Sequence, residues 1–325
     1  MNAQTFKTYF VFVRFFAYFV LVYLLVVSIL SKVSLSDFTI LQICTKNRLW
    51  GSPGGFGQSL ERFRDIEAYK NIDVLFIGSS HAYRSFDPRI FSKYGLTSFN
   101  MGSPSQTPLN SYYLLKRYFS ALNPRLVIYE AYFKIFEVDG LESFYDLCTN
   151  LSFSKEILEM VSAIRHPHAI NTLVSTYLAR IGDPLREAKQ QTIEGETYVS
   201  GGYVESYLLQ ESTDFGKTRH IKISEVQMEY FTKIFSFLRE RDCKVVLVMQ
   251  PMPKEYLETI ANYDISSQKI SQVARSFGIQ YFDFNDMLTL DTQKDFKDYQ
   301  HLNSYGVTKF NEALIDILFS KKIVS

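Results

Sequence analysis

The segment from Asp73 to His81 limits the fold of this 325-residue chain more than any other. Four apolar residues, Val74–Ile77, predict a strand that is buried on both faces, which is typical of a parallel sheet covered by helices. Gly78 ends this run and allows a tight turn, and Ser79 and Ser80 follow directly. The turn therefore lies at the carboxyl edge of an α/β sheet, where binding and catalytic sites form.

A serine on such a turn has two interpretations. A catalytic serine needs an exposed hydroxyl with backbone N–H groups nearby, and a strand-to-helix turn provides both. The alternative is a serine that only caps the next turn, which is the commoner use of a Gly-Ser-Ser sequence. Asp87-Pro88 follows and predicts a helix that has an aspartate N-cap and proline at its first position.

A second motif lies near the C-terminus. Asp298 and His301 are three residues apart, just before a helical pattern that runs from Val307 to Leu318, for which Ser304 is the expected cap. An aspartate in this position can accept the Nδ1 proton of the histidine, which leaves Nε2 free to take a proton from a serine. The alternative is a histidine that caps or packs at the helix start. The two motifs together favour the catalytic interpretation.

These motifs resemble those of a known family. Gly78-Ser79-Ser80 after a buried strand, Asn100-Met101-Gly102 after a second strand, and Asp298-x-x-His301 are similar to the sequence blocks of the SGNH hydrolases. Within that family the chain most resembles the membrane-anchored branch related to the D-alanyl-lipoteichoic-acid transfer protein and the alginate O-acetylation proteins. The resemblance covers roughly residues 71–320, with the motifs in the family's order.

The resemblance implies a role for each matched residue. Ser80 is the expected nucleophile, His301 the base, and Asp298 the residue that orients His301. The backbone N–H groups of Ser80 and Gly102 are the expected oxyanion donors. The resemblance also implies a doubly wound α/β domain with a parallel sheet in three flavodoxin-like layers.

The sequence departs from the family pattern in two places. Ser79 stands where these hydrolases commonly have aspartate. No Gly-x-Asn-Asp block follows the third strand, Leu126–Ala131, so the usual asparagine oxyanion donor is unassigned. Glu130, at the end of this strand, has two interpretations. It points into the site, where it binds substrate or supports the residues that do, or it pairs with a nearby arginine. Ser79 is a second candidate for substrate binding.

The N-terminus predicts a membrane anchor. Arg14 is the only charged residue between Tyr9 and Leu30, and an apolar segment of this length spans a bilayer. It is longer than the apolar region of a usual signal peptide, and no Ala-x-Ala cleavage site follows it. Lysine and arginine counts do not decide its orientation. The default is a short tail inside the cell and the catalytic domain outside the cytoplasmic membrane.

The expected organisation has three parts. Residues 1–34 form the tail and the anchor, residues 35–70 a juxtamembrane connection with a leading helix, and residues 71–325 the α/β domain with a helical insertion at about 137–220. The other predicted strands are Thr97–Met101, Lys244–Met249 and Ile279–Phe284. The other predicted helices are Gln58–Tyr69, Leu109–Leu122, Ser154–Ile164, His168–Ala179, Val226–Arg239 and Glu255–Phe277.

Composition excludes several other classes of function. The net charge of +1 gives no basis for nucleic-acid binding. Three scattered cysteines form neither a metal site nor a disulfide framework, although a Cys44–Cys148 bridge stays open. His166 and His168 have no third ligand in sight, so no metal or other cofactor is expected.

Three functions remain. The first is an acyltransferase that modifies a cell-surface or secreted glycopolymer, with a membrane-bound O-acyltransferase as its partner. The second is a plain carbohydrate esterase or deacetylase. The third is a non-catalytic scaffold that keeps the fold as a binding surface.

Overall fold

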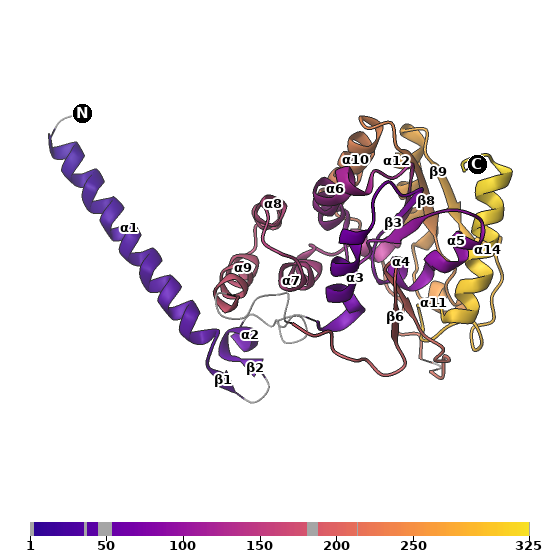
Figure 1. Ribbon diagram of the computed structural model, residues 1–325, viewed down its shortest axis with the longest axis horizontal. Coiled ribbons are helices and arrows are strands. Elements are labelled where there is room, and N and C mark those ends of the chain that lie inside the picture. The colour runs from indigo at the N-terminus through magenta and orange to yellow at the C-terminus, as the bar shows by residue number, and fades with distance from the viewer. Residues whose placement is uncertain (1–2, 36–37, 45–53, 181–187, 213, 325) are drawn as a thin grey trace.

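The computed structural model describes residues 3–35, 38–44, 54–180, 188–212 and 214–324. A five-stranded parallel sheet lies at its centre (Figure 1). The strand order is β4-β3-β5-β8-β9, which confirms the doubly wound fold and has the flavodoxin-like arrangement. The strands are β3 (Val74–Ile77), β4 (Ser98–Asn100), β5 (Leu126–Glu130), β8 (Lys244–Met249) and β9 (Gln280–Asp283).

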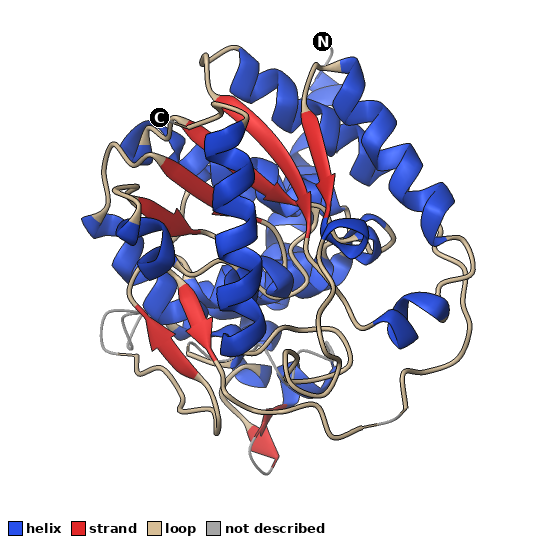
Figure 2. Ribbon diagram, turned by 90° about the vertical axis from the view of Figure 1, so that its right-hand side faces the viewer, coloured by secondary structure: helices blue, strands red, loops and turns tan. Residues whose placement is uncertain are grey.

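Helices cover both faces of this sheet because alternate residues of each strand are apolar on opposite sides (Figure 2). Leu75 and Ile77 of β3 pack into one cluster, and Val74 and Phe76 pack into the other. The first face carries α6 (Pro108–Leu122), α10 (Glu225–Arg239) and α12 (Tyr263–Ser276), and the second carries α4 (Ser80–Ser85), α5 (Pro88–Lys93) and α14 (Ser304–Ser320).

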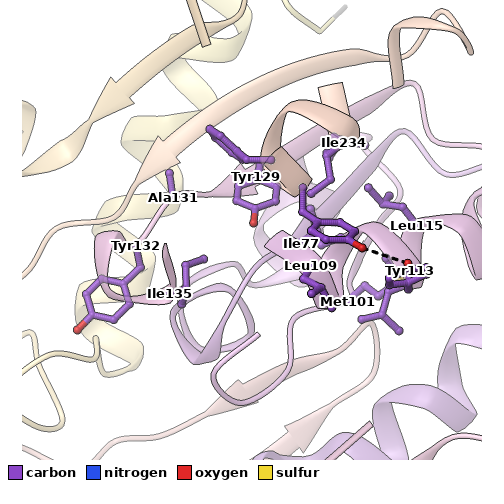
Figure 3. Packing of buried hydrophobic residues seen from close by; sticks show 14 of the residues in the cluster. Ile77, Met101, Leu109, Tyr113, Leu115, Tyr129, Ala131, Tyr132, Ile135 and Ile234 are labelled. Atoms are coloured by element: carbon purple, nitrogen blue, oxygen red, sulfur yellow. Dashed lines mark hydrogen bonds between the residues drawn. The ribbon is translucent and has the colours of Figure 1, made fainter. Parts of the chain in front are cut away.

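The larger cluster reaches the carboxyl ends of the strands (Figure 3). Ile77 and Tyr129 from neighbouring strands pack with Met101, Leu109 and Ile234, and all five side chains are buried. Full burial of one such side chain contributes about 1.5–3 kcal/mol. The core therefore fixes the strand ends from which the candidate site residues extend.

Residues 137–220 contain elements outside the central sheet: α7 (Leu141–Asn150), α8 (Lys155–Ile164), α9 (Pro167–Ala179), and a hairpin of β6 (Thr197–Val199) and β7 (Tyr203–Glu205). The hairpin turn lies against the sheet edge, where the Asn100 N–H donates to the Gly201 carbonyl at 2.7 Å. A Cβ on Gly202 would lie 2.1 Å from the Asn100 carbonyl oxygen, so this close approach requires glycine.

The N-terminal helix α1 (Ala3–Leu30) extends away from the α/β domain (Figure 1). Near its C-terminal end it meets α9, where the Tyr23 hydroxyl donates to Asn171 Oδ1 at 2.7 Å. Among the described residues it is the one helix that is long and apolar enough to cross a membrane, judged by length and composition.

The predicted connection at 35–70 lies partly outside the described residues. Its described elements are β1 (Ser34–Leu35), β2 (Phe38–Thr39), α2 (Ile40–Cys44), η1 (Phe56–Gln58), α3 (Ser59–Asp65) and η2 (Ile66–Ala68).

Two predicted details are wrong. The helix expected over Glu255–Phe277 is broken into α11 (Lys254–Glu258) and α12, because the side chain of Asn262 in the break exchanges two hydrogen bonds of 2.8 Å with the Ile221 backbone. The cap of α14 is Asn303 rather than Ser304, since the Asn303 side chain accepts the N–H groups of Tyr305 and Gly306 in the first turn of the helix.

The two cysteines whose side chains the structure describes form no disulfide. Cys148 and Cys243 are buried free thiols, and burial raises the pKa of Cys148 to about 11. The side chain of Cys44 lies outside the described part of the chain.

Candidate active site

The two serines after β3 have different positions. Ser79 has extended backbone and is the N-cap of α4, where its hydroxyl accepts the His81 N–H. Ser80 is the first residue of α4, and its side chain remains partly exposed. The Ser80 Oγ lies 2.9 Å from Nε2 of His301, 221 residues further along the chain. The fold thus brings together the two motifs that the sequence singled out.

Asp298 holds His301 by several contacts at once. The two carboxylate oxygens lie 3.0 Å and 2.9 Å from Nδ1 of His301. Asp298 Oδ1 also accepts the backbone N–H groups of Gln300 and His301 at 3.0 Å and 2.9 Å. The ionised carboxylate accepts the Nδ1 proton, so Nε2 is the acceptor that faces Ser80. Because Asn303 caps α14, the alternative in which this pair caps the helix is not what the structure shows.

The environment sets the charge of both groups. Burial lowers the pKa of His301, and the nearby Asp298 only partly offsets this, so the imidazole is neutral near pH 7. Burial alone would raise the pKa of Asp298, but His301 and the two backbone donors together hold it well below its ordinary value. A neutral imidazole next to a carboxylate can accept a proton from a serine hydroxyl.

The predicted oxyanion donors are only partly available. The Ser80 N–H lies in the first turn of α4, and it has no acceptor among the described residues. The Gly102 N–H donates to Asn100 Oδ1 at 3.1 Å. A Cβ on Gly102 would lie 2.9 Å from the Ser79 carbonyl oxygen, so the glycine lets its loop approach the serine turn.

Asn100 does not supply the missing donor. Its amide group donates to the carbonyls of Ala82 and Phe86, at 2.7 Å and 3.2 Å, inside the protein. The asparagine donor that the family commonly uses therefore stays unassigned.

Glu130 and Ser79 bind each other. Both are buried, and Glu130 Oε2 accepts the N–H and the hydroxyl of Ser79 at 2.8 Å each, while Oε1 accepts the Tyr132 N–H. Burial raises the pKa of Glu130 to about 7 despite these three donors. Glu130 thus supports the serine turn from behind. No arginine in the described part of the chain pairs with this carboxyl, and Glu130 has no exposed surface for direct contact with substrate.

His81 is a residue that the sequence reasoning missed. Its ring centroid lies 3.9 Å from that of Tyr132 and 4.6 Å from that of His301, so it fills the space beside the base. Burial, followed by the neighbouring His301, keeps the pKa of His81 well below its ordinary value. The signal available in the sequence was its position directly after Ser80.

A buried ion cluster next to the site was also missed. Glu196 accepts hydrogen bonds from Arg84 at 2.7 Å and from Lys297 at 2.8 Å, and each of the three side chains is at most 10% exposed. Burial alone would raise the pKa of Glu196, but the two cations lower it. The cluster connects α4, the segment before β6, and the residue that precedes Asp298.

Within the described ranges, no group of three or more His, Cys, Asp or Glu side chains is arranged to hold a metal ion. His166 instead caps α9, since its Nδ1 accepts the His168 N–H at 3.2 Å.

No family model matches the chain, and no curated protein matches it. Solved structures similar to it include a GDSL-like lipase from Bacteroides thetaiotaomicron, with 12% identity over 82% of this chain and 99% of that one, at a TM-score of 0.42. A protein named as an acylhydrolase from Bacteroides fragilis has 14% identity over 81% and 95% of the two chains, at a TM-score of 0.39. A protein named as a platelet activating factor from Streptococcus pneumonia has 13% identity over 86% and 97%, at a TM-score of 0.43.

One of these neighbours is named as GDSL-like and another as an acylhydrolase, and none of the three names concerns lipoteichoic acid or alginate. At such low similarity, the assignment of the site rests on the geometry of this chain alone.

Proposed function

We propose that this chain is a serine acyltransferase or esterase that works through an acyl-serine intermediate. The observation that carries the proposal is the continuous hydrogen-bonded chain from Ser80 through His301 to Asp298. His301 Nε2 takes the hydroxyl proton while Ser80 Oγ attacks the acyl carbonyl. His301 then returns the proton to the leaving alcohol, and an acceptor hydroxyl or water releases the acyl group in a second, equivalent step.

The substrate we propose is an acyl group, most simply O-acetyl, on a cell-surface or secreted glycopolymer. Helix α1 supports a membrane location: its 28 residues span about 42 Å at 1.5 Å per residue. Its apolar side chains are largely exposed, from Phe6 to Ile29, which a helix in water does not sustain. We place the α/β domain outside the cytoplasmic membrane, with a membrane-bound O-acyltransferase as the partner that supplies the acyl group.

Two alternatives follow from particular observations. The partly exposed Ser80 gives water the same access to the intermediate as an acceptor hydroxyl, which favours a plain esterase or deacetylase. The Gly102 N–H already has an acceptor in Asn100, which favours a non-catalytic scaffold. In a catalytic protein that hydrogen bond gives way to, or is shared with, the oxyanion.

The deciding experiment uses the full chain in detergent micelles with p-nitrophenyl acetate. We expect release of nitrophenol and an acetyl group on Ser80 in the mass spectrum of the acid-quenched protein. Ser80→Ala should show neither while keeping the melting temperature of the wild type. Turnover by a folded Ser80→Ala protein, or an acetyl group on Ser79 instead, would contradict the proposal. Adding an oligosaccharide acceptor separates transfer from hydrolysis.

A further inference from the structure

A pocket of about 360 Å³ adjoins the loop that carries Asp298 and His301. Its lining includes residues 214–217 and Arg219, together with Tyr256 and Tyr299, the latter directly following Asp298. Lys134, in the short helix η3 (Phe133–Phe136) that follows β5, also lines it.

Positive charge exceeds negative charge in this pocket. Lys134, Lys217 and Arg219 line it, against the single carboxylate of Asp214. Arg219 is paired with Glu137, which lies outside the lining. Lys134 is half-buried and has neither an ion pair nor a hydrogen-bond acceptor among the described residues. Burial, and then Arg219, lower the pKa of Lys134, and Glu142 and Glu137, which form no ion pair with it, offset this only in part.

Aromatic contacts connect the pocket to the catalytic residues. The rings of Tyr256 and Tyr299 have centroids 5.5 Å apart, and the hydroxyls of Tyr256 and Tyr132 are hydrogen-bonded at 2.7 Å. The Tyr132 ring in turn contacts the ring of His81, which contacts that of His301. Tyr299 is 38% exposed, so part of its ring is open to a ligand. The pocket lining is thus linked to His301 through Tyr132 and His81.

We propose that this pocket binds an anionic group, a carboxylate or a phosphate, carried by a sugar residue of the substrate. An ammonium without a partner gains a charge-assisted hydrogen bond when such a group binds, and the tyrosine faces accept the apolar face of a sugar ring. The identification of this sugar as part of the substrate rests on the proposed function. The binding of an anionic sugar at Lys134 does not.

The test measures binding alone, so it is independent of catalysis. Full-length Ser80→Ala protein in micelles is titrated with glucuronate, glucose 6-phosphate and glucose in a calorimeter. We expect at least one anionic sugar to bind about tenfold more tightly than glucose, and Lys134→Gln to abolish that difference. Lys222→Gln is the matched control, because Lys222 is exposed and does not line the pocket.

Each outcome has a defined meaning. A preference for glucuronate indicates a carboxylated polymer, a preference for glucose 6-phosphate a phosphorylated one, and both support the pocket. Equal binding of all three sugars, or a preference that persists in folded Lys134→Gln, overturns it. If Lys134→Gln does not fold, the test is made on the Ser80→Ala protein alone. Raising the salt concentration from about 50 mM to about 500 mM must then weaken the binding of the anionic sugar more than that of glucose. Absence of an acyl-serine would refute the proposed function and leave this result standing.

Discussion

Two carboxyl groups lie near the serine turn, and their pKa values are shifted in opposite directions. Asp298 is hydrogen-bonded to His301, which is hydrogen-bonded to Ser80, and the pKa of Asp298 is held well below its ordinary value. Glu130 contacts Ser79 directly, and its pKa is raised to about 7. Both accept two or more hydrogen bonds, so the number of donors does not explain the difference.

Solvent exposure and neighbouring charges explain the difference between the two pKa shifts. The Asp298 side chain is 34% exposed and lies beside an imidazole that can become a cation, whereas Glu130 is fully buried among neutral donors. Desolvation disfavours the charged form, and hydrogen bonds, a nearby cation and water each offset it; Glu130 has only the first of these. The first arrangement suits a residue that stabilises a transient imidazolium, and the second suits a residue that holds a backbone turn in place.

The largest expected effect is the loss of activity when Asp298 is replaced by its amide, asparagine. In Asp298→Asn the amide nitrogen faces Nδ1 of His301 and favours the tautomer with the proton on Nε2, which cannot accept the Ser80 proton. We expect the rate of p-nitrophenyl acetate hydrolysis to fall about 10⁴-fold in Asp298→Asn, and the rate of His301→Ala to fall nearly as far as that of Ser80→Ala. Rates are measured per folded molecule, with melting temperatures alongside. Wild-type turnover in a folded His301→Ala protein would refute the triad.

The same substitution at Glu130 should act on stability and its pH dependence. The raised pKa of Glu130 stabilises the fold fully below about pH 4.5, and this contribution is lost as pH rises through about 7. A shift from 4.5 to about 7 corresponds to about 3 kcal/mol. Glu130→Gln does not titrate, so its free energy of unfolding should fall less than that of the wild type between these pH values. Urea titrations across that range measure both slopes.

Parallel slopes for the two proteins would contradict the assignment of this effect to Glu130. Asp146 is the internal reference, because burial also raises its pKa to about 7 and it remains in both proteins. A residual pH dependence in Glu130→Gln is therefore expected.

A smaller effect concerns the pH dependence of activity. His301 must be neutral to accept the Ser80 proton, and burial lowers its pKa from 6.5. The acidic limb of kcat/KM for p-nitrophenyl acetate should therefore have its midpoint below pH 6.5, with activity lost as pH falls through it. A midpoint above pH 6.5 would mean that the imidazolium is stabilised in the free enzyme, against the burial seen here.

The sequence predicted those parts of this comparison that are local. Asp298 and His301 are three residues apart, and the buried run Val74–Ile77 leads directly to the serines, so short motifs identified the hydrogen-bonded residues and the strand that presents Ser80. The apolar runs also predicted the parallel sheet, since burial on both faces leaves a continuous pattern. The pairing of Ser80 with His301, 221 residues apart, rested on the complementary chemistry of the two motifs and on the family resemblance, because no local pattern links them.

The rest depends on contacts that no local pattern encodes. Ser79 and Glu130 are 51 residues apart, and Arg84 and Glu196 are 112 apart. Which buried polar groups meet depends on the register of neighbouring strands and on the path of the insertion. The sequence therefore identified Glu130 as a residue of interest without giving its partner.

The smallest expected effect distinguishes the two adjacent serines. Ser79→Ala removes the hydroxyl that caps α4 through the His81 N–H and donates to Glu130, so it should cost about 1 kcal/mol in the free energy of unfolding. Turnover per folded molecule should stay within a few-fold of the wild type, because Ser79 does not touch His301. Ser85→Ala is the matched control: Ser85 is buried in the same helix, but its hydroxyl has no hydrogen-bond partner in the structure, so its loss should change stability little. A Ser79→Ala protein that is as stable as Ser85→Ala but inactive would give Ser79 a chemical role and reverse the division of labour between the two serines.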